Sequence, residues 1–243
     1  MGHRALFAAV AASAAAAAVG GHVARGATDS SARSLVGRHT LDKGAVVVRQ
    51  TGVSTSHLGH QATRASWGVV LANTSSGHDA LDVRVTVDLV GANGKAVRHG
   101  GRVAKQTLAL IPAGRAFYYG GTATFAGDVD VRAVRAHVTA VGSTPSRRYT
   151  LPPVSDVHLD TSTGQLMGTF TNPYSLSISP YDCAADIVFF DRRGRVIGGA
   201  GPGEMGHLES DIEPGSGAPV YFSVPDGIAL SRIASARITV FPG

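Results

Sequence analysis

Cysteine is nearly missing from this chain of 243 residues, in which Cys183 is the single example. An intramolecular disulfide is therefore impossible, and we expect Cys183 to be a small buried hydrophobe on a strand. Charged residues make up only 16% of the chain and aromatic residues 6%. A disordered chain carries more charge and fewer Val, Ile and Leu, so disorder is excluded after about residue 44.

Apolar residues make up 44% of the sequence, and glycine occurs 31 times. Few charges and many glycines and valines favour short strands joined by tight turns. The formal net charge is +5 with a pI near 9.7, but the basic residues are dispersed along the chain. No patch interleaves basic and aromatic residues as strand-binding surfaces do, so we expect no nucleic-acid partner.

The N-terminus has the layout of a secretory signal. His3 and Arg4 precede an alanine-rich apolar run, Ala5–Val19, which is short for a membrane span of about 20 strongly apolar residues. We interpret residues 1–20 as a signal peptide cleaved before Gly21, or alternatively as an N-terminal membrane anchor through residues 5–19. Residues 21–43 are small and polar and are expected to form a flexible tether.

Strand-like runs follow from residue 44 onward. In the clearest of them apolar residues alternate with polar ones from Leu81 to Val90, which is the period of a half-buried antiparallel strand. The Asn93-Gly94 pair after this run favours a tight hairpin turn.

The segment from Gly68 to Val141 repeats in the segment from Gly168 to Phe241. Four stretches match in the same order, and they are Gly68–Asn73 with Gly168–Asn172, the turn at Gly94 with that at Gly194, Leu110–Gly114 with Asp211–Gly215, and the strand around Ala136 with that around Arg237. Such a series indicates a duplication.

The repeat predicts an all-β fold of two tandem immunoglobulin-like antiparallel β-sandwich domains with about seven strands each. We place the first domain at residues 44–142, a linker at 143–153 and the second domain at 154–243. Pro152 and Pro153 favour an extended chain, so we expect the linker to hold the two domains apart.

The order of these signals resembles the FxLYD family of bacterial envelope domains and the sandwich of late-embryogenesis-abundant type proteins. Phe189-Phe190-Asp191 with Gly194 carries the motif in the second copy, flanked by Asn172 and by Pro214-Gly215. The first copy departs from it, with Leu89-Val90-Gly91 at the aromatic positions. The resemblance implies an exported sandwich protein and no shared catalytic residues.

Candidate sites for chemistry are few. His57 and His60 lie three apart, but no Cys, Asp or Glu is near them in sequence to complete a zinc site. Gly201–Gly206 fits a dinucleotide-loop pattern, but Pro202 and the missing helix favour a mobile loop. Ser216 lies in a turn, and the acidic pair of Asp128 and Asp130 is expected at a solvated strand start. We therefore assign no catalytic, cofactor or metal residue.

Aromatic residues gather in two places, at Phe117–Tyr119 and around the loop that contains Tyr174 and Tyr181. We expect them to serve in packing, with a surface for peptide or glycan as the alternative, and we expect Trp67 to anchor the first core. The leading functional hypothesis is a non-catalytic structural or binding module whose partner is a protein or glycan of the cell envelope. The alternatives are an extracytoplasmic hydrolase or metal-dependent enzyme, and a membrane-anchored sensor domain.

N-terminal sequencing of the protein tests the export signal. Because small residues at Ala18 and Gly20 suit signal cleavage, we expect protein recovered from the medium or envelope to begin near Gly21. Recovery of a chain that retains Ala5–Val19 in the membrane fraction would instead support the anchor.

Overall fold

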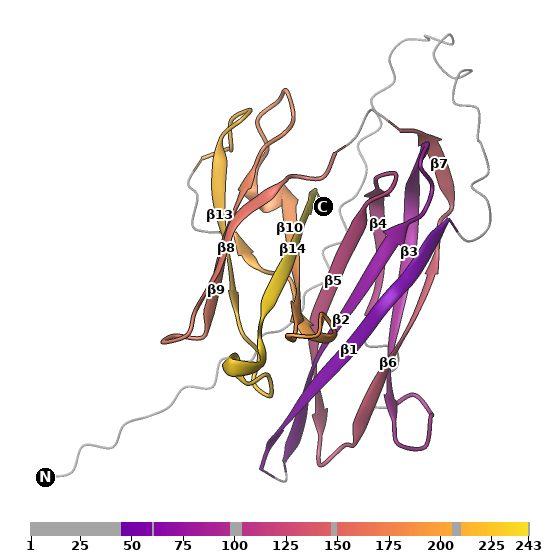
Figure 1. Ribbon diagram of the computed structural model, residues 1–243, viewed down its shortest axis with the longest axis vertical. Coiled ribbons are helices and arrows are strands. Elements are labelled where there is room, and N and C mark those ends of the chain that lie inside the picture. The colour runs from indigo at the N-terminus through magenta and orange to yellow at the C-terminus, as the bar shows by residue number, and fades with distance from the viewer. Residues whose placement is uncertain (1–44, 60, 98–103, 147–149, 206–209, 243) are drawn as a thin grey trace, which may run out of the picture. The chain divides into compact units, whose positions relative to one another are not determined.

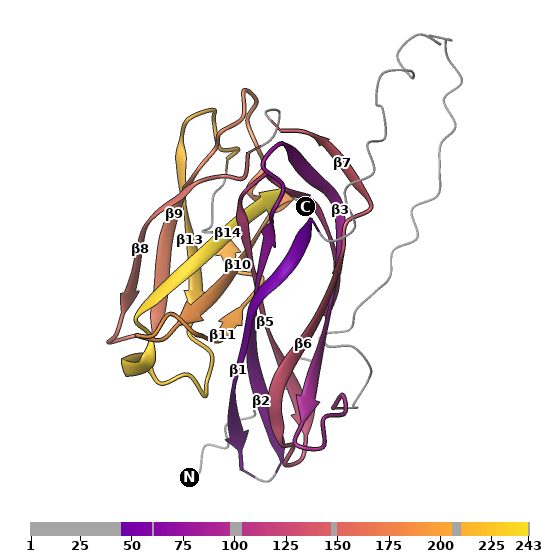
Figure 2. The ribbon, with the colours of Figure 1, turned by 45° about the vertical axis from the view of Figure 1, so that its right-hand side comes forward.

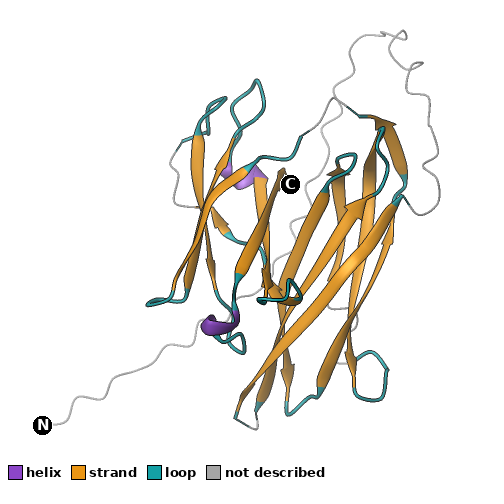
Figure 3. Cartoon of the chain, in the orientation of Figure 1, coloured by secondary structure: helices purple, strands orange, loops and turns teal. Residues whose placement is uncertain are grey.

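Extended strands form nearly all the regular structure of the chain (Figure 3), which confirms the all-β class. The computed structural model describes residues 45–59, 61–97, 104–146, 150–205 and 210–242. In these ranges the only helical segments are two short 3-10 turns, η1 (Pro180–Asp182) and η2 (Leu230–Arg232). No helix of this described part is long and apolar enough to span a membrane. The predicted signal peptide, the tether and His60 lie outside it.

The first sandwich consists of two antiparallel sheets (Figure 1). One sheet has the order β1-β2-β5, and the other has the order β4-β3-β6 with β7 also paired to β3. The strands are β1 (Val46–Leu58), β2 (Ala62–Asn73), β3 (His78–Gly91), β4 (Ala104–Ile111), β5 (Ala116–Ala126), β6 (Val131–Thr139) and β7 (Gly142–Pro145). The pairing of β7 extends this sandwich into the segment that we expected to be a linker.

The second sandwich repeats this topology. Its sheets have the orders β8-β9-β13 with β12 added outside β13, and β11-β10-β14. The strands are β8 (Val154–Asp160), β9 (Gln165–Thr171), β10 (Cys183–Phe190), β11 (Val196–Ala200), β12 (Glu204–Met205), β13 (Gly217–Ser223) and β14 (Ser235–Pro242). Because β8-β9-β13 corresponds to β1-β2-β5 and β11-β10-β14 to β4-β3-β6, the two sandwiches are copies of one topology.

Each sandwich has its own hydrophobic core. Trp67 is only 3% exposed and meets Tyr119 edge-to-face at 5.0 Å, which confirms its role as a core anchor. The residue opposite Trp67 on β5 is Gly121, and the corresponding cross-strand pair of the second sandwich is Leu166 with Phe222. In the first copy a tryptophan therefore faces a glycine. In the second copy a leucine and a phenylalanine share the corresponding space, as close packing requires.

The glycines matched in the sequence comparison do not correspond in the structure. When Asn73 is placed on Asn172, the core residue Val69 falls on Gly168, and Gly68 falls on Met167. The predicted match was wrong by one residue at this strand. Since side chains alternate between the two faces of a sheet, this shift exchanges core and outer positions.

The matched asparagines do the same work in both copies. The Nδ2 of Asn73 donates to the carbonyls of His78 and Ile111 at 2.9 and 3.0 Å. The Nδ2 of Asn172 likewise donates to the carbonyls of Leu176 and Ile212, at 2.9 and 2.8 Å. Each side-chain oxygen accepts a backbone N–H two residues further on. A buried amide thus satisfies the backbone where two loops meet, and removing it would leave buried carbonyls without donors.

The two central hairpins also agree. The N–H of Gly91 donates to the carbonyl of Lys95, and the N–H of Asp191 donates to that of Arg195. Gly94 and Gly194 both have a φ of 71°, which only glycine adopts at little cost. Asp191 also accepts the backbone N–H and the guanidinium of Arg195, and these bonds lower the pKa of the carboxyl to about 2.

The two sandwiches are not held apart, so that prediction was wrong. Buried hydrogen bonds cross between them: the hydroxyl of Ser54 donates to the carbonyl of Ile197 at 2.6 Å, and that of Ser66 donates to the carbonyl of Gly199 at 2.7 Å. The Ser66 hydroxyl in turn accepts the N–H of Gly199 at 3.0 Å. Two serines thereby satisfy the open edge of β11, which would otherwise be buried unpaired. We call this contact of β1, β2 and β5 with β10, β11 and β14 the junction.

Glycines let the strands at the junction approach closely. A Cβ on Gly120 would overlap the carbonyl oxygen of Ile187, and one on Gly68 would lie 2.5 Å from the carbonyl oxygen of Gly198. Strands β10 and β14 lie beside β5 in two views (Figure 1, Figure 2), and the N–H of Tyr118 donates to the hydroxyl of Thr239 at 2.9 Å.

Apolar packing completes the junction. Val70, Val188 and Val196 form a small buried cluster between the sandwiches. Phe241, at the end of β14, belongs to the core of the first sandwich, where its ring lies 5.3 Å from that of Phe117. The last strand of the chain therefore stabilises both sandwiches, because each loses apolar contacts if the junction opens.

We expect Gly120→Ala to destabilise the protein by about 1–3 kcal/mol, because the new methyl group must push Ile187 away. Urea unfolding followed by tryptophan fluorescence measures the change through Trp67. Gly77→Ala is the matched control, since a Cβ there meets nothing within 4 Å and should leave the midpoint nearly unchanged. Equal midpoints for the two variants would show that the junction is not closely packed.

Candidate functional site

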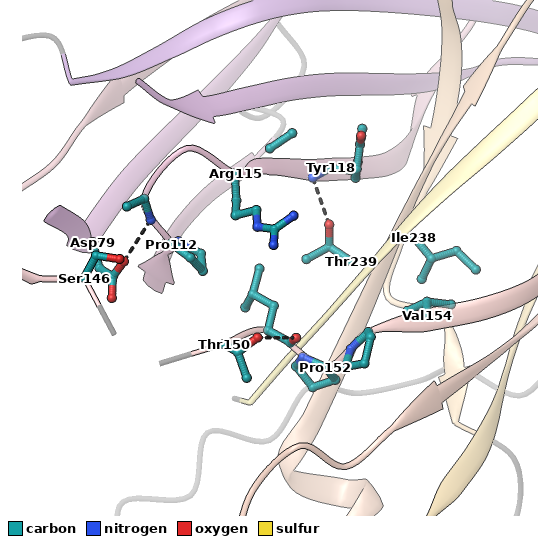
Figure 4. A pocket seen from close by; sticks show the side chains of 14 residues that line it. Asp79, Pro112, Arg115, Tyr118, Ser146, Thr150, Pro152, Val154, Ile238 and Thr239 are labelled. Atoms are coloured by element: carbon teal, nitrogen blue, oxygen red, sulfur yellow. Dashed lines mark hydrogen bonds between the residues drawn. The ribbon is translucent and has the colours of Figure 1, made fainter. Parts of the chain in front are cut away.

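A pocket of about 570 Å³ lies beside the junction. The turn before β5, the segment that enters β8, and β14 supply its walls (Figure 4). The lining residues are Asp79, Pro112, Ala113, Arg115, Ala116, Tyr118, Ser146, Thr150, Leu151, Pro152, Pro153, Val154, Ile238 and Thr239. Both sandwiches therefore contribute, and the pocket depends on their contact.

Arg115 is the basic side chain of this lining. It lies between Pro112 and Thr239 and points across the pocket toward Thr150 and Pro152 (Figure 4). The turn that carries Arg115 is fixed by its backbone, because the N–H of Arg115 donates to the carbonyl of Pro112 and its carbonyl accepts the N–H of Asn73.

Asp79 also holds this turn in place. Its Oδ1 accepts the backbone N–H of Ala113 at 2.8 Å, and the residue is only 1% exposed. The other oxygen, Oδ2, is buried and has no hydrogen-bond partner within the described ranges. Buried polar atoms of this kind are uncommon and draw attention to the place where they occur.

The histidine pair predicted as a weak metal candidate is only partly described. His57 lies at the end of β1, where its Nδ1 is 3.0 Å from a carboxylate oxygen of Asp128. His60 lies outside the described residues. Among the residues that the structure describes, no group of three or more His, Cys, Asp or Glu side chains is placed to hold a metal ion.

His57 also lies near a hydroxyl, since its Nδ1 is 3.3 Å from the Oγ1 of Thr63. An acid, a histidine and a hydroxyl are the components of a hydrolytic triad. Here, however, Asp128 and Thr63 both face the same ring nitrogen, and Thr63 is fully buried. Its hydroxyl donates to the carbonyl of Gly127 and accepts the N–H of Val129. The threonine therefore serves as a structural bridge between loops in this arrangement.

The acidic pair is divided between two bases. Asp128 meets His57, while Asp130 forms an ion pair with Arg132 at 2.6 Å, and the side chains of both acids are more than half exposed. Two carboxylates that each face a base at the surface do not form the opposed pair needed for glycoside chemistry. The expected position at a solvated strand start is confirmed.

The predicted mobile loop Gly201–Gly206 is closely packed at Gly201 and Gly203, contrary to the prediction, and Gly206 lies outside the described residues. A Cβ on Gly201 would overlap the Oδ1 of Asp186, and one on Gly203 would overlap the ring of Phe222. The short strand β12 follows Gly203 in place of a helix. These glycines therefore allow close contact between chain segments. Ser216 lies in the predicted turn, with its N–H donating to the carbonyl of Glu213.

The aromatic clusters separate into core and surface. Phe117 and Tyr119 belong to the first core, and Tyr118 meets Phe190 edge-to-face at 6.2 Å in the junction. Tyr181 is 89% exposed, whereas the hydroxyl of Tyr174 donates to the carbonyl of Thr150. Packing thus accounts for the first cluster and only in part for the second.

Cys183 opens β10 and is half-buried, packed at the margin of the second core. Burial raises the pKa of its thiol, and the nearby charge of Asp182 raises it further. A raised pKa disfavours the thiolate, which is the reactive form.

Asp186 is the most unusual ionisable group of the junction. It lies on β10 and is 5% exposed, and its Oδ2 has no hydrogen-bond partner in the described part of the chain. Burial raises the pKa of Asp186 well above its ordinary value of 3.8. Burial also raises the pKa of Tyr119, with a smaller contribution from the charge of Asp186. The neutral carboxylic acid is therefore the form that suits this site.

Sequence reasoning did not select Arg115 or Asp186 as site residues. One signal was available, because Asp186 interrupts the otherwise apolar run Ala184–Phe190. The pocket residues come from distant parts of the chain, and nothing in their local sequence marks them. No known protein family and no curated protein matches the chain.

We expect Asp186→Asn to raise the free energy of unfolding at pH 7 and to leave it unchanged near pH 3.5. In the folded protein the carboxyl stays neutral above pH 3.8, while in the unfolded chain it ionises. The natural protein therefore loses up to about 1.4 kcal/mol of stability per pH unit as the pH rises from 3.8 toward the folded pKa. An asparagine cannot ionise and removes this loss.

Urea unfolding at a series of pH values measures the effect. Asp211→Asn is the control, because Asp211 is exposed and should change stability little at any pH. A parallel pH profile for the natural protein and Asp186→Asn would contradict a neutral, buried Asp186.

Proposed function

We propose that this chain is an exported, non-catalytic protein of the cell envelope or secreted space that acts as a structural or binding module. The observation that supports this best is the pocket at the junction, which two copies of one sandwich build together. A solvent-open hollow lined by turns and a strand end suits recognition, and loops on a rigid scaffold are the usual place for it.

The chemistry of the described residues favours binding over catalysis. The acid–histidine–hydroxyl group at His57 has its hydroxyl buried and already bonded on both sides. The pocket has hydroxyls at Ser146, Thr150 and Thr239, but no histidine is among the lining residues that the structure describes, and the Oδ1 of the buried Asp79 accepts the backbone N–H of Ala113. Binding needs a fixed shape and complementary charge, and both are available here.

Export is proposed from the sequence, through residues 1–20 and the tether at 21–43. The resemblance to FxLYD domains agrees with an envelope location. Its motif residues serve the fold in this chain, since Phe189 is buried in the second core and Asp191 holds the hairpin with Gly194. The partner that we propose is a protein or a glycan of the envelope.

A capture experiment tests the binding function. The full chain with a C-terminal tag, immobilised and exposed to an envelope extract, should retain a defined protein or glycan that the unfolded chain does not. Mass spectrometry and sugar analysis identify what is retained. We expect His57→Ala to retain the same partner, because His57 lies at a strand end and not in the pocket lining.

Hydrolysis is the competing outcome. If the natural chain cleaves ester, peptide or glycoside reporters and His57→Ala does not, then the proposal of a non-catalytic binding module is wrong and the hydrolase alternative is correct.

A further inference from the structure

The pocket beside the junction has the chemical features of a site for a small organic acid. Its volume of about 570 Å³ is within the range of small-molecule sites. Two charged side chains are found among the described lining residues, Arg115 and Asp79. Which of them a ligand can reach decides the charge of that ligand.

Arg115 is accessible and unengaged. It is exposed, and its guanidinium makes no hydrogen bond or ion pair within the described ranges. By contrast, Arg64, Arg132 and Arg195 each meet a carboxylate at 2.5 to 2.9 Å. The guanidinium carries five N–H donors in a planar fork that fits the two oxygens of a carboxylate.

The position of Arg115 is set in advance. Its turn is held by the bond from Ala113 to Asp79, and by the bond from the N–H of Gly114 to the carbonyl of Ser75. Fixing the backbone that carries the arginine reduces the entropy lost when a ligand binds.

Asp79 cannot be reached in the same way. It is 1% exposed, its Oδ1 is occupied by Ala113, and its Oδ2 is buried. A ligand in the pocket therefore meets the arginine directly and feels the carboxylate only as a nearby negative charge. That charge weakens the binding of an anion and leaves the arginine as the contact group.

The walls opposite Arg115 are apolar. Leu151 lines this side together with Pro152 and Pro153, whereas the side chain of Ile238 is buried in the second core. The prolines restrict the backbone of this wall, and the hydroxyl of Thr239 lies at its edge with a proton left to donate, since it accepts the N–H of Tyr118. A ligand with a short apolar group beside its acid would bury that group here.

We propose that this pocket binds a small organic carboxylate, with the acid group on the Arg115 guanidinium and the apolar part against Leu151, Pro152 and Pro153. This inference rests on the proposed binding function and names the ligand class of its site.

Titration of the full chain with benzoate, acetate, inorganic phosphate and butylammonium tests the proposal by calorimetry and by methyl NMR. We expect benzoate to bind more tightly than acetate and phosphate and to shift the methyl signals of Leu151. We expect butylammonium not to bind. Arg115→Gln should weaken benzoate binding by at least about tenfold, since a hydrogen bond to a charged group is lost.

Two further variants separate charge from folding. Asp79→Asn keeps an oxygen for Ala113 and removes the negative charge, so we expect it to bind benzoate more tightly. Arg115→Lys retains the charge without the fork and should give intermediate affinity. Arg237→Gln, an exposed arginine beside Ile238 but outside the lining, is the control and should bind as the natural protein does.

Four results would overturn the proposal. Binding of butylammonium that Asp79→Asn abolishes would make this a cation site. Equal affinity for phosphate and benzoate, or equal affinity of Arg115→Gln and the natural chain, would remove the carboxylate class or the arginine contact. Failure of every probe with retention of an envelope partner by Arg115→Gln would reject this pocket and leave the proposed binding function intact.

Discussion

The structure depends on the close approach of backbone to backbone at the junction. Strand β11 is the edge of its sheet, and an edge carries unpaired N–H and carbonyl groups that are costly to bury. Here two hydroxyls, those of Ser54 and Ser66, take the place of a neighbouring strand. They reach β11 only because Gly68 and Gly120 leave room for it and for β10. The glycine content of the chain is thus in part a requirement of this contact.

The two copies have diverged according to which of their faces is covered. The hairpins align Val90 with Phe190, so Asp88 on β3 corresponds to Val188 on β10. Val188 is fully buried in the junction, whereas Asp88 lies on a partly exposed outer face. Arg84 on that face corresponds to Ala184. The first copy therefore lacks the apolar face through which the second copy docks.

The sequence predicted the all-β class, the duplication and the matched turns because each has a local pattern. The alternation of apolar and polar residues marks Leu81–Val90 as a strand. The glycines Gly94 and Gly194 mark the turns, because each turn needs a positive φ. The junction was missed because it has no period of its own. The run Ala184–Phe190 is buried on both faces, and such a run looks like any core strand until its second partner is known. The pocket was missed for a related reason, since Arg115 and Thr239 line the same hollow only after both sandwiches have folded.

The pocket and the junction depend on the same contact between the two sandwiches. The wall that carries Arg115 belongs to the first sandwich, and the edge that carries Thr239 belongs to the second. Anything that binds both walls favours the closed junction, since a ligand stabilises the state to which it binds. Ionisation of Asp186 acts in the opposite direction, because no basic partner meets its charge among the described residues. Ligand and proton would then act on the same contact, and the duplication supplies what a single sandwich lacks, the second wall of the pocket.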